Sequence, residues 1–131
     1  MSSIKAGILE RLVASILREM GFSTRTRAVI DGVEVDVHAT RQVGASRFRI
    51  WVECKNWANE VGVKEVRDFV GGIFSAREKP HLALFVASYL SEEARREADR
   101  SGIIAIALGH RATKHNVSTV KELLRREFRK N

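Results

Sequence analysis

Two short apolar runs in the second half of the chain constrain its fold more than any other feature. Residues 82–87 and 103–108 consist only of apolar residues, which is typical of strands buried on both faces of a sheet. Between them, Ser91 precedes two glutamates and opens a predicted helix that ends at Arg100. Buried strands joined by a helix run parallel, because the crossover returns the chain to the same edge of the sheet.

The remaining segments predict further strands and helices. Apolar residues recur at steps of three and four over 4–20, which indicates a helix that stops at Gly21. Strands are predicted at 22–30, 33–39 and 47–55, with a turn at 31–32 and a loop at 40–46. Helices are predicted at 63–77 and at 117–129, the latter capped at Ser118. We therefore expect one α/β domain over residues 1–131, with a mixed five-stranded sheet flanked by helices.

The balance of charges points to a polyanionic partner. The chain of 131 residues has 23 Lys and Arg against 16 Asp and Glu, a net charge of +7, so nucleic acid is the first candidate partner. No apolar run reaches the roughly 20 residues of a membrane span, and no secretory leader is recognisable at the N-terminus. The single cysteine excludes an internal disulfide. We expect a cytoplasmic protein without a membrane partner, although charge alone does not distinguish a binder from an enzyme.

Three polar residues on neighbouring predicted strands could carry chemistry. Asp36 lies on the polar side of 33–39, and Glu53 and Lys55 lie two residues apart on 47–55, hence on one face. Two carboxylates that converge at a sheet suit a hard cation such as Mg²⁺. A lysine beside them can orient water or stabilise the charge of a phosphodiester in its transition state. On the residues alone, solvated positions on a half-buried strand explain the same pattern.

The pattern resembles that of a known enzyme family over residues 8–109. Val35-Asp36-Val37, then Glu53-Cys54-Lys55, resemble the motifs of the PD-(D/E)xK nuclease superfamily, with the closest resemblance to its Mrr-like restriction endonuclease branch. Gly21-Phe22, the helix segment 66–71 and the segment 85–103 occur in the order of that branch. Val35 stands where the superfamily name has proline, and Glu53 stands where the Mrr branch often has glutamine.

The resemblance implies a restriction-endonuclease-like core and a metal-dependent DNA endonuclease that leaves 5′-phosphate ends. It implies catalytic roles for Asp36, Glu53 and Lys55, with Glu10 of the first helix in support. Asp36, Glu53 and the backbone carbonyl of Cys54 would bind Mg²⁺, with Mn²⁺ as a substitute. Cleavage of both strands would require two copies, so a homodimer is expected.

Several residues near the predicted site are candidates for contact with DNA, although a solvated surface explains some of them equally well. They are Arg25, Arg27, Arg49, Trp57 and Lys64. Cys54 itself is predicted to be a small core residue, not a nucleophile.

Three alternatives remain open at this point. The archaeal Holliday junction resolvases share the same core, so a structure-selective resolvase is one. A catalytically inactive nucleic-acid-binding module is the second. The third is a protein-interaction subunit, which only the apolar side of the predicted C-terminal helix supports.

Overall fold

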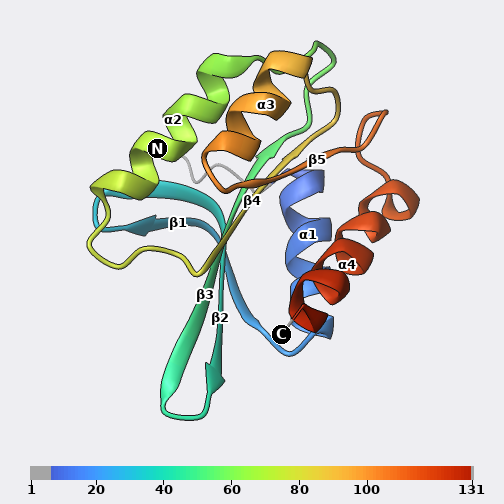
Figure 1. The fold of residues 1–131 in the computed structure, drawn as a ribbon. Helices are drawn as coiled ribbons and strands as arrows, with labels where there is room; N and C mark the ends of the chain where they lie inside the picture. Colours follow the sequence, from blue (N-terminus) through green and yellow to red (C-terminus); the bar gives the residue numbers. More distant parts are fainter. Residues whose placement is uncertain (1–6, 131) are drawn as a thin grey trace, which may run out of the picture.

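A computed structural model describes residues 7–130 (Figure 1). Four helices and five strands follow one another in these residues: α1 Ile8–Glu19, β1 Ser23–Ile30, β2 Val33–Val43, β3 Ser46–Lys55, α2 Val63–Ser75, β4 Leu82–Ala87, α3 Glu92–Arg100, β5 Ile104–Ala107 and α4 Lys114–Arg129. The predicted start of the first helix at residue 4 lies outside the described residues.

The five strands form one mixed sheet in the order β1-β2-β3-β4-β5. β1, β2 and β3 pair antiparallel, whereas β3, β4 and β5 pair parallel. α2 connects β3 to β4, and α3 connects β4 to β5. The predicted α/β fold is therefore confirmed, with hairpins in the first half and helical crossovers in the second.

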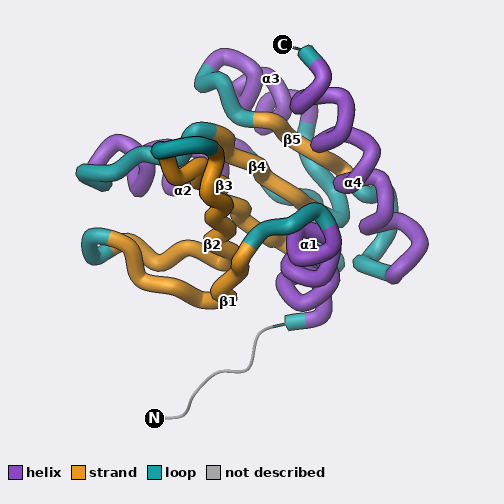
Figure 2. The backbone as a smooth tube through the Cα atoms, turned by 90° about the horizontal axis from the view of Figure 1, so that it is seen from below, coloured by secondary structure: helices purple, strands orange, loops and turns teal. Residues whose placement is uncertain are grey.

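Helices cover both faces of the sheet, α1 and α4 on one and α2 and α3 on the other (Figures 1 and 2). On the α1–α4 side, Leu17 and Leu124 meet Val86 of β4 in one buried cluster. On the α2–α3 side, Phe69 meets Phe85 of the same strand. β4 thus contributes buried side chains to both cores, as its continuous apolar run predicts.

Two predicted boundaries are wrong, and backbone hydrogen bonding explains both. The loop predicted at 40–46 is shorter, a turn at residues 44–45, because β2 and β3 pair from Val37↔Val52 to Val43↔Ser46. α4 begins at Lys114, not at residue 117, because Thr113 and Asn116 form a capping box at its start. Ser118, the predicted cap, lies inside the helix.

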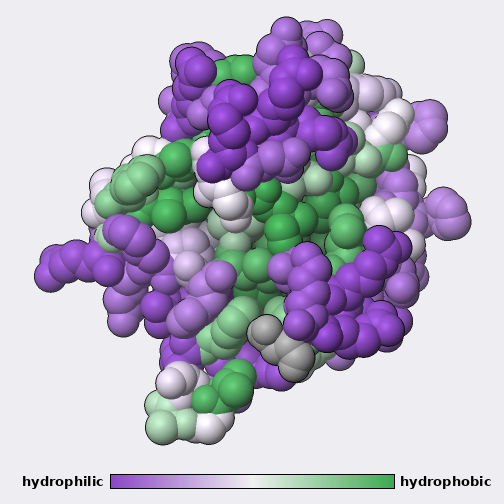
Figure 3. Space-filling model, viewed as in Figure 1, coloured by the Kyte–Doolittle hydropathy of each residue, from purple (hydrophilic) through white to green (hydrophobic). Residues whose placement is uncertain are grey.

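The apolar side of α4 packs on the core, which accounts for it without a partner subunit. Val117, Val120 and Leu124 are at most 1% exposed, and they lie in the cluster that contains α1. Figure 3 shows polar side chains over the helices, with apolar residues in the middle of the face between them and at part of the tip of the projecting β2–β3 hairpin. Within residues 7–130, no helix has the length and hydropathy that crossing a membrane requires.

Candidate active site

Strands β2 and β3 part from each other beside Asp36. Their pairing ends at Val37, which lies opposite Val52. Asp36 directly precedes Val37 on β2, and its Oδ2 accepts a hydrogen bond of 2.8 Å from the backbone N–H of Cys54 on β3. The Asp36 carboxylate therefore spans the point where the ladder opens, and β3 holds it there.

The alternation of faces along β2 breaks at the same point. Strict alternation predicts that Val35 and Val37 share one face, but Val35 is buried on the α2–α3 side and Val37 on the α1–α4 side. The register of β1 and β2 leaves out both Arg27 and Asp36, and Arg27 has a left-handed backbone, with φ of 52°. This irregular stretch turns Asp36 toward the gap between the strands instead of leaving it on one face with His38.

Glu53 and Lys55 form the other wall of the site, at the end of β3. Glu53 Oε2 lies 3.2 Å from Lys55 Nζ, and the two side chains are only 18% and 22% exposed. Because β3 pairs with β4 as far as Lys55↔Ala87, both side chains stand on a regular strand. The predicted pairing of two residues on one face is observed.

Burial and mutual repulsion alter the acidity of both carboxyl groups. Burial raises the pKa of Glu53 to about 7, the charge of Asp36 adds to the rise, and Lys55 opposes it. Burial also raises the pKa of Asp36, against the opposing hydrogen bond from the Cys54 N–H. The two carboxylates therefore attract positive charge more strongly than carboxylates in water do.

Glu10 reaches the site from α1. Its side chain is 11% exposed, and its Oε2 lies 3.9 Å from Arg27 Nη2. The charge of Glu10 contributes to the raised pKa of Asp36. Gly7 makes room for it, because a Cβ at position 7 would lie 2.7 Å from Glu10 Oε1. The structure thus brings together all four predicted catalytic residues and the predicted DNA contact Arg27, with Gly7 beside Glu10.

Arg27 has an unsatisfied donor beside the carboxylates. Its Nε atom is buried and has no hydrogen-bond partner in the described part of the chain. A buried donor without a partner is rare in proteins and costs free energy. Together with the left-handed backbone, this donor marks Arg27 as a strained position beside the carboxylates.

Two polar residues hold the segment after Lys55. The buried Ser88 donates from its hydroxyl to the carbonyl oxygens of Lys55 and Trp57. Asn56 accepts at Oδ1 from the Ala112 N–H at 2.7 Å, which ties β3 to the loop before α4. These hydrogen bonds could not be predicted from the sequence, because each joins segments more than 30 positions apart.

The predicted DNA-contacting residues lie in three different places. Arg27 lies in the site, and Trp57, 41% exposed, lies beside it with its ring centre 5.2 Å from Lys55 Nζ. Lys64 of α2 pairs with Asp68 at 2.9 Å, as a solvated helix residue does. Arg25 and Arg49 line a separate pocket.

The donor set fits a hard divalent cation with few protein ligands. Among residues 7–130, no three side chains of His, Cys, Asp or Glu are grouped so that they could hold a metal ion. Two carboxylates and a backbone carbonyl suit Mg²⁺, which commonly keeps several of its waters. The buried Cys54 thiol, whose pKa is raised well above its ordinary value, is unsuited to nucleophilic chemistry.

A mixed α/β sheet that carries an aspartate and a Glu-x-Lys pair where two strands part defines the PD-(D/E)xK nuclease class. The chain belongs to the restriction endonuclease family, whose family model, described as restriction endonuclease (Mrr_cat), matches residues 1–112. α4 lies beyond the matched residues, although it completes the core. The comparison with curated proteins gives no match.

Solved structures with the same fold include nucleases. AF1548, a protein of unknown function, aligns with a TM-score of 0.62 and 21% identity over 88% of this chain and 67% of its own. A repair endonuclease from Pyrococcus abyssi aligns with a TM-score of 0.55 and 17% identity over 82% of this chain and 49% of its own. The structure of EndoMS in complex with double-stranded DNA aligns with a TM-score of 0.54 and 16% identity over 86% of this chain and 48% of its own. The chain thus spans about half of each nuclease, and the similarity concerns the fold.

Proposed function

We propose that this chain is a divalent-cation-dependent DNA endonuclease that hydrolyses phosphodiester bonds and leaves 5′-phosphate ends. The observation that carries the proposal is the group of Asp36, Glu53 and Lys55 at the parting of β2 and β3. Its two carboxyl groups have raised pKa values and its lysine lies 3.2 Å from one of them. Membership of the restriction endonuclease family supports the same activity.

Each residue of the group has a role in this reaction. Asp36, Glu53 and the Cys54 carbonyl would hold Mg²⁺ or Mn²⁺, and Glu10 would support them from α1. The bound cation would supply Lewis acidity toward the phosphate and lower the pKa of a bound water. Lys55 would orient the attacking water and stabilise the developing negative charge on the phosphodiester.

Arg27 and Trp57 are proposed to hold the DNA at this site. The Arg27 side chain is 31% exposed, and a guanidinium group commonly contacts phosphate oxygens. The exposed ring of Trp57 suits stacking on a base. Because one site cuts one strand, we propose that a homodimer cleaves both strands.

A cleavage assay with matched substrates tests the proposal. Linear duplex, methylated duplex, single-stranded DNA and a four-way junction are incubated with Mg²⁺ or Mn²⁺. Asp36→Ala and Lys55→Ala are expected to lose about 100-fold or more in rate, a loss typical of missing electrostatic stabilisation. Arg126→Ala, which removes an exposed charge of α4 outside the site, is the matched control and should cleave normally.

The outcomes separate the alternatives. Preference for the junction would select a resolvase, and preference for methylated duplex would select a restriction-like role. Binding without cleavage of any substrate by the unaltered protein would refute the endonuclease and leave a binding module. Sedimentation measurements with and without DNA test the dimer, and a monomer that linearises plasmid in one event would refute it.

A further inference from the structure

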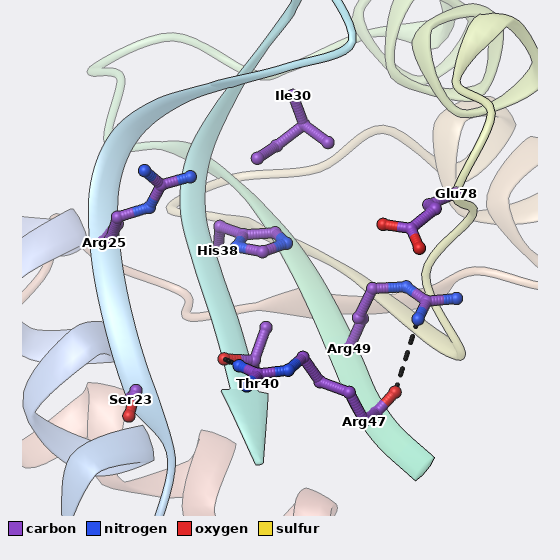
Figure 4. Close-up of a pocket in the computed structure, with 8 residues that line it drawn as sticks. All are labelled: Ser23, Arg25, Ile30, His38, Thr40, Arg47, Arg49 and Glu78. Carbon is purple, nitrogen blue, oxygen red and sulfur yellow. Dashed lines mark hydrogen bonds between the residues drawn. The ribbon is translucent and has the colours of Figure 1, made fainter. Parts of the chain in front are cut away.

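A second pocket lies on the antiparallel part of the sheet, beside the loop between α2 and β4 (Figure 4). Its volume is about 430 Å³, which is within the usual range of ligand sites. The lining residues are Ser23, Arg25, Ile30, His38, Thr40, Arg47, Arg49 and Glu78. None of the four proposed catalytic residues lines it, so it is distinct from the candidate active site.

Strand pairing places the polar side chains of this pocket side by side. Arg25 of β1 lies opposite His38 of β2, and Thr40 of β2 lies opposite both Ser23 and Arg49. Figure 4 shows these side chains around a common space, with Glu78 on the far side of it. The pocket is therefore built on three paired strands, which fix its shape.

The positive charge of this pocket is not neutralised by the protein. None of the ion pairs formed among residues 7–130 includes Arg25, Arg47 or Arg49. By contrast, three cations of α4 each have a glutamate oxygen within 3.3 Å. Because the pocket holds three guanidinium groups and one carboxylate, it has a surplus of positive charge that an anion would balance.

Two of the guanidinium groups are held in place by neutral acceptors. Arg49 donates from Nε and Nη2 to the carbonyl oxygen of Lys79, at 3.1 and 3.0 Å. Arg47 donates from Nη1 to Thr40 Oγ1 at 3.3 Å. These bonds orient the side chains without removing their charge, and such preorganisation lowers the entropic cost of binding a ligand.

His38 adds an imidazole to the same pocket. Its ring nitrogens join the hydroxyls of Ser23 and Thr40 as hydrogen-bonding groups. The pocket therefore combines guanidinium, hydroxyl and imidazole groups, a set that suits phosphate oxygens.

We propose that this pocket binds a backbone phosphate of the DNA, away from the bond that is cut. This inference rests on the proposed function, because it takes DNA as the ligand. His38 lies two residues from Asp36 on β2, which is about 7 Å along a strand. A DNA strand held at the candidate active site therefore passes close to the pocket, and its backbone supplies the anion.

Binding of duplex DNA in EDTA at several salt concentrations tests the pocket without cleavage. The double variant Arg25→Ala, Arg47→Ala is expected to bind DNA about tenfold more weakly. The slope of log affinity against log salt concentration should become shallower by about one unit for each lost phosphate contact. Arg126→Ala removes an exposed charge of α4 and should leave the salt dependence unchanged. Glu78→Gln removes the one carboxylate and should tighten binding severalfold, a gain that damage to the fold cannot produce.

Inorganic phosphate serves as a second probe, observed through the NMR signals of residues that line the pocket. Added phosphate should shift the signals of Thr40 and Arg49 in the unaltered protein and not in the double variant. If phosphate binds but the double variant retains normal DNA affinity and salt dependence, the pocket serves a free anion and the proposal is wrong. If the double variant binds both DNA and phosphate as the unaltered protein does, the proposal is also wrong.

Failure of the endonuclease proposal would look different. In that case no DNA is cut by the unaltered protein, yet the double variant still loses DNA affinity. Cleavage at saturating DNA measures the active site separately, since the pocket variants should retain most of their maximal rate.

Discussion

Replacing Glu53 by glutamine is expected to stabilise the metal-free protein while it abolishes cleavage. The folded protein raises the pKa of Glu53 from its ordinary value of 4.5 to about 7. The protonated carboxyl is therefore the form that the fold prefers, and the charged form is disfavoured. Glutamine resembles the protonated carboxyl in shape and does not titrate.

The size of the effect follows from the difference in pKa. At about 1.4 kcal/mol for each pKa unit, the change from 4.5 to about 7 corresponds to about 3 kcal/mol in the free energy of unfolding. The value of about 7 already includes the opposing effect of Lys55, so the lost ion pair is contained in this figure. Burial therefore outweighs the ion pair, and a net gain of about 3 kcal/mol is expected above about pH 7.

The pH dependence has a defined sign. Glu53 has a folded pKa above its unfolded value, so its contribution to stability is fully present below about pH 4.5 and is lost as pH rises through about 7. Denaturant unfolding in EDTA should therefore show no gain for Glu53→Gln below about pH 4.5. The gain should increase up to about pH 7 and stay constant above it.

The same measurement with Mg²⁺ adds a second criterion. The cation should stabilise the unaltered protein at high pH, because it binds the folded state through the ionised carboxylate, and it should stabilise the variant much less. A variant that is less stable than the unaltered protein at pH 8, or a difference that does not change with pH, would refute this account of the site.

Three further changes test other contacts of the structure. Gly7→Ala should displace the Glu10 carboxylate, since the new Cβ would lie 2.7 Å from its Oε1, and should lower kcat by about tenfold to 100-fold with little change in Tm. Ser88→Ala should cost about 1–2 kcal/mol of stability in urea unfolding and slow cleavage, because buried carbonyls that include that of Lys55 lose a donor. Leu124→Ala should cost about 2–5 kcal/mol in the same assay, because Leu124 is 1% exposed in the core; a cost below 1 kcal/mol would show that α4 is not part of the folding unit.

The sequence predicted elements where a local pattern and the tertiary contacts agree. The run 82–87 became the buried β4, and Ser91 caps α3 by accepting from the Ala94 N–H. The predictions failed where distant contacts decide. The polar segment 40–46 carries no strand pattern, and only pairing across the hairpin makes it part of β2 and β3.

In the candidate site, too, local patterns predicted some features, and distant contacts decided the others. The step of two residues on one strand is enough to place Glu53 and Lys55 together. The irregular backbone at Arg27 could not be predicted, because nothing in the local sequence marks this residue for a left-handed conformation. The role of Gly7 was also hidden, because it depends on where Glu10 of the same helix points once Arg27 is beside it.

The charges of the site and of the whole chain act at different distances. The net charge of +7 attracts DNA from afar, but such attraction is screened by salt beyond about 10 Å. At contact above about pH 7, where Glu53 is ionised, the site presents the carboxylates of Glu10, Asp36 and Glu53 against the cations of Arg27 and Lys55, an arrangement that repels phosphate. A bound divalent cation makes the net charge of the site positive, whereas the arginine pocket is positive with or without the cation. Metal-free protein is therefore expected to hold DNA by the pocket, and only the metal-bound protein should bring the scissile phosphate to Lys55.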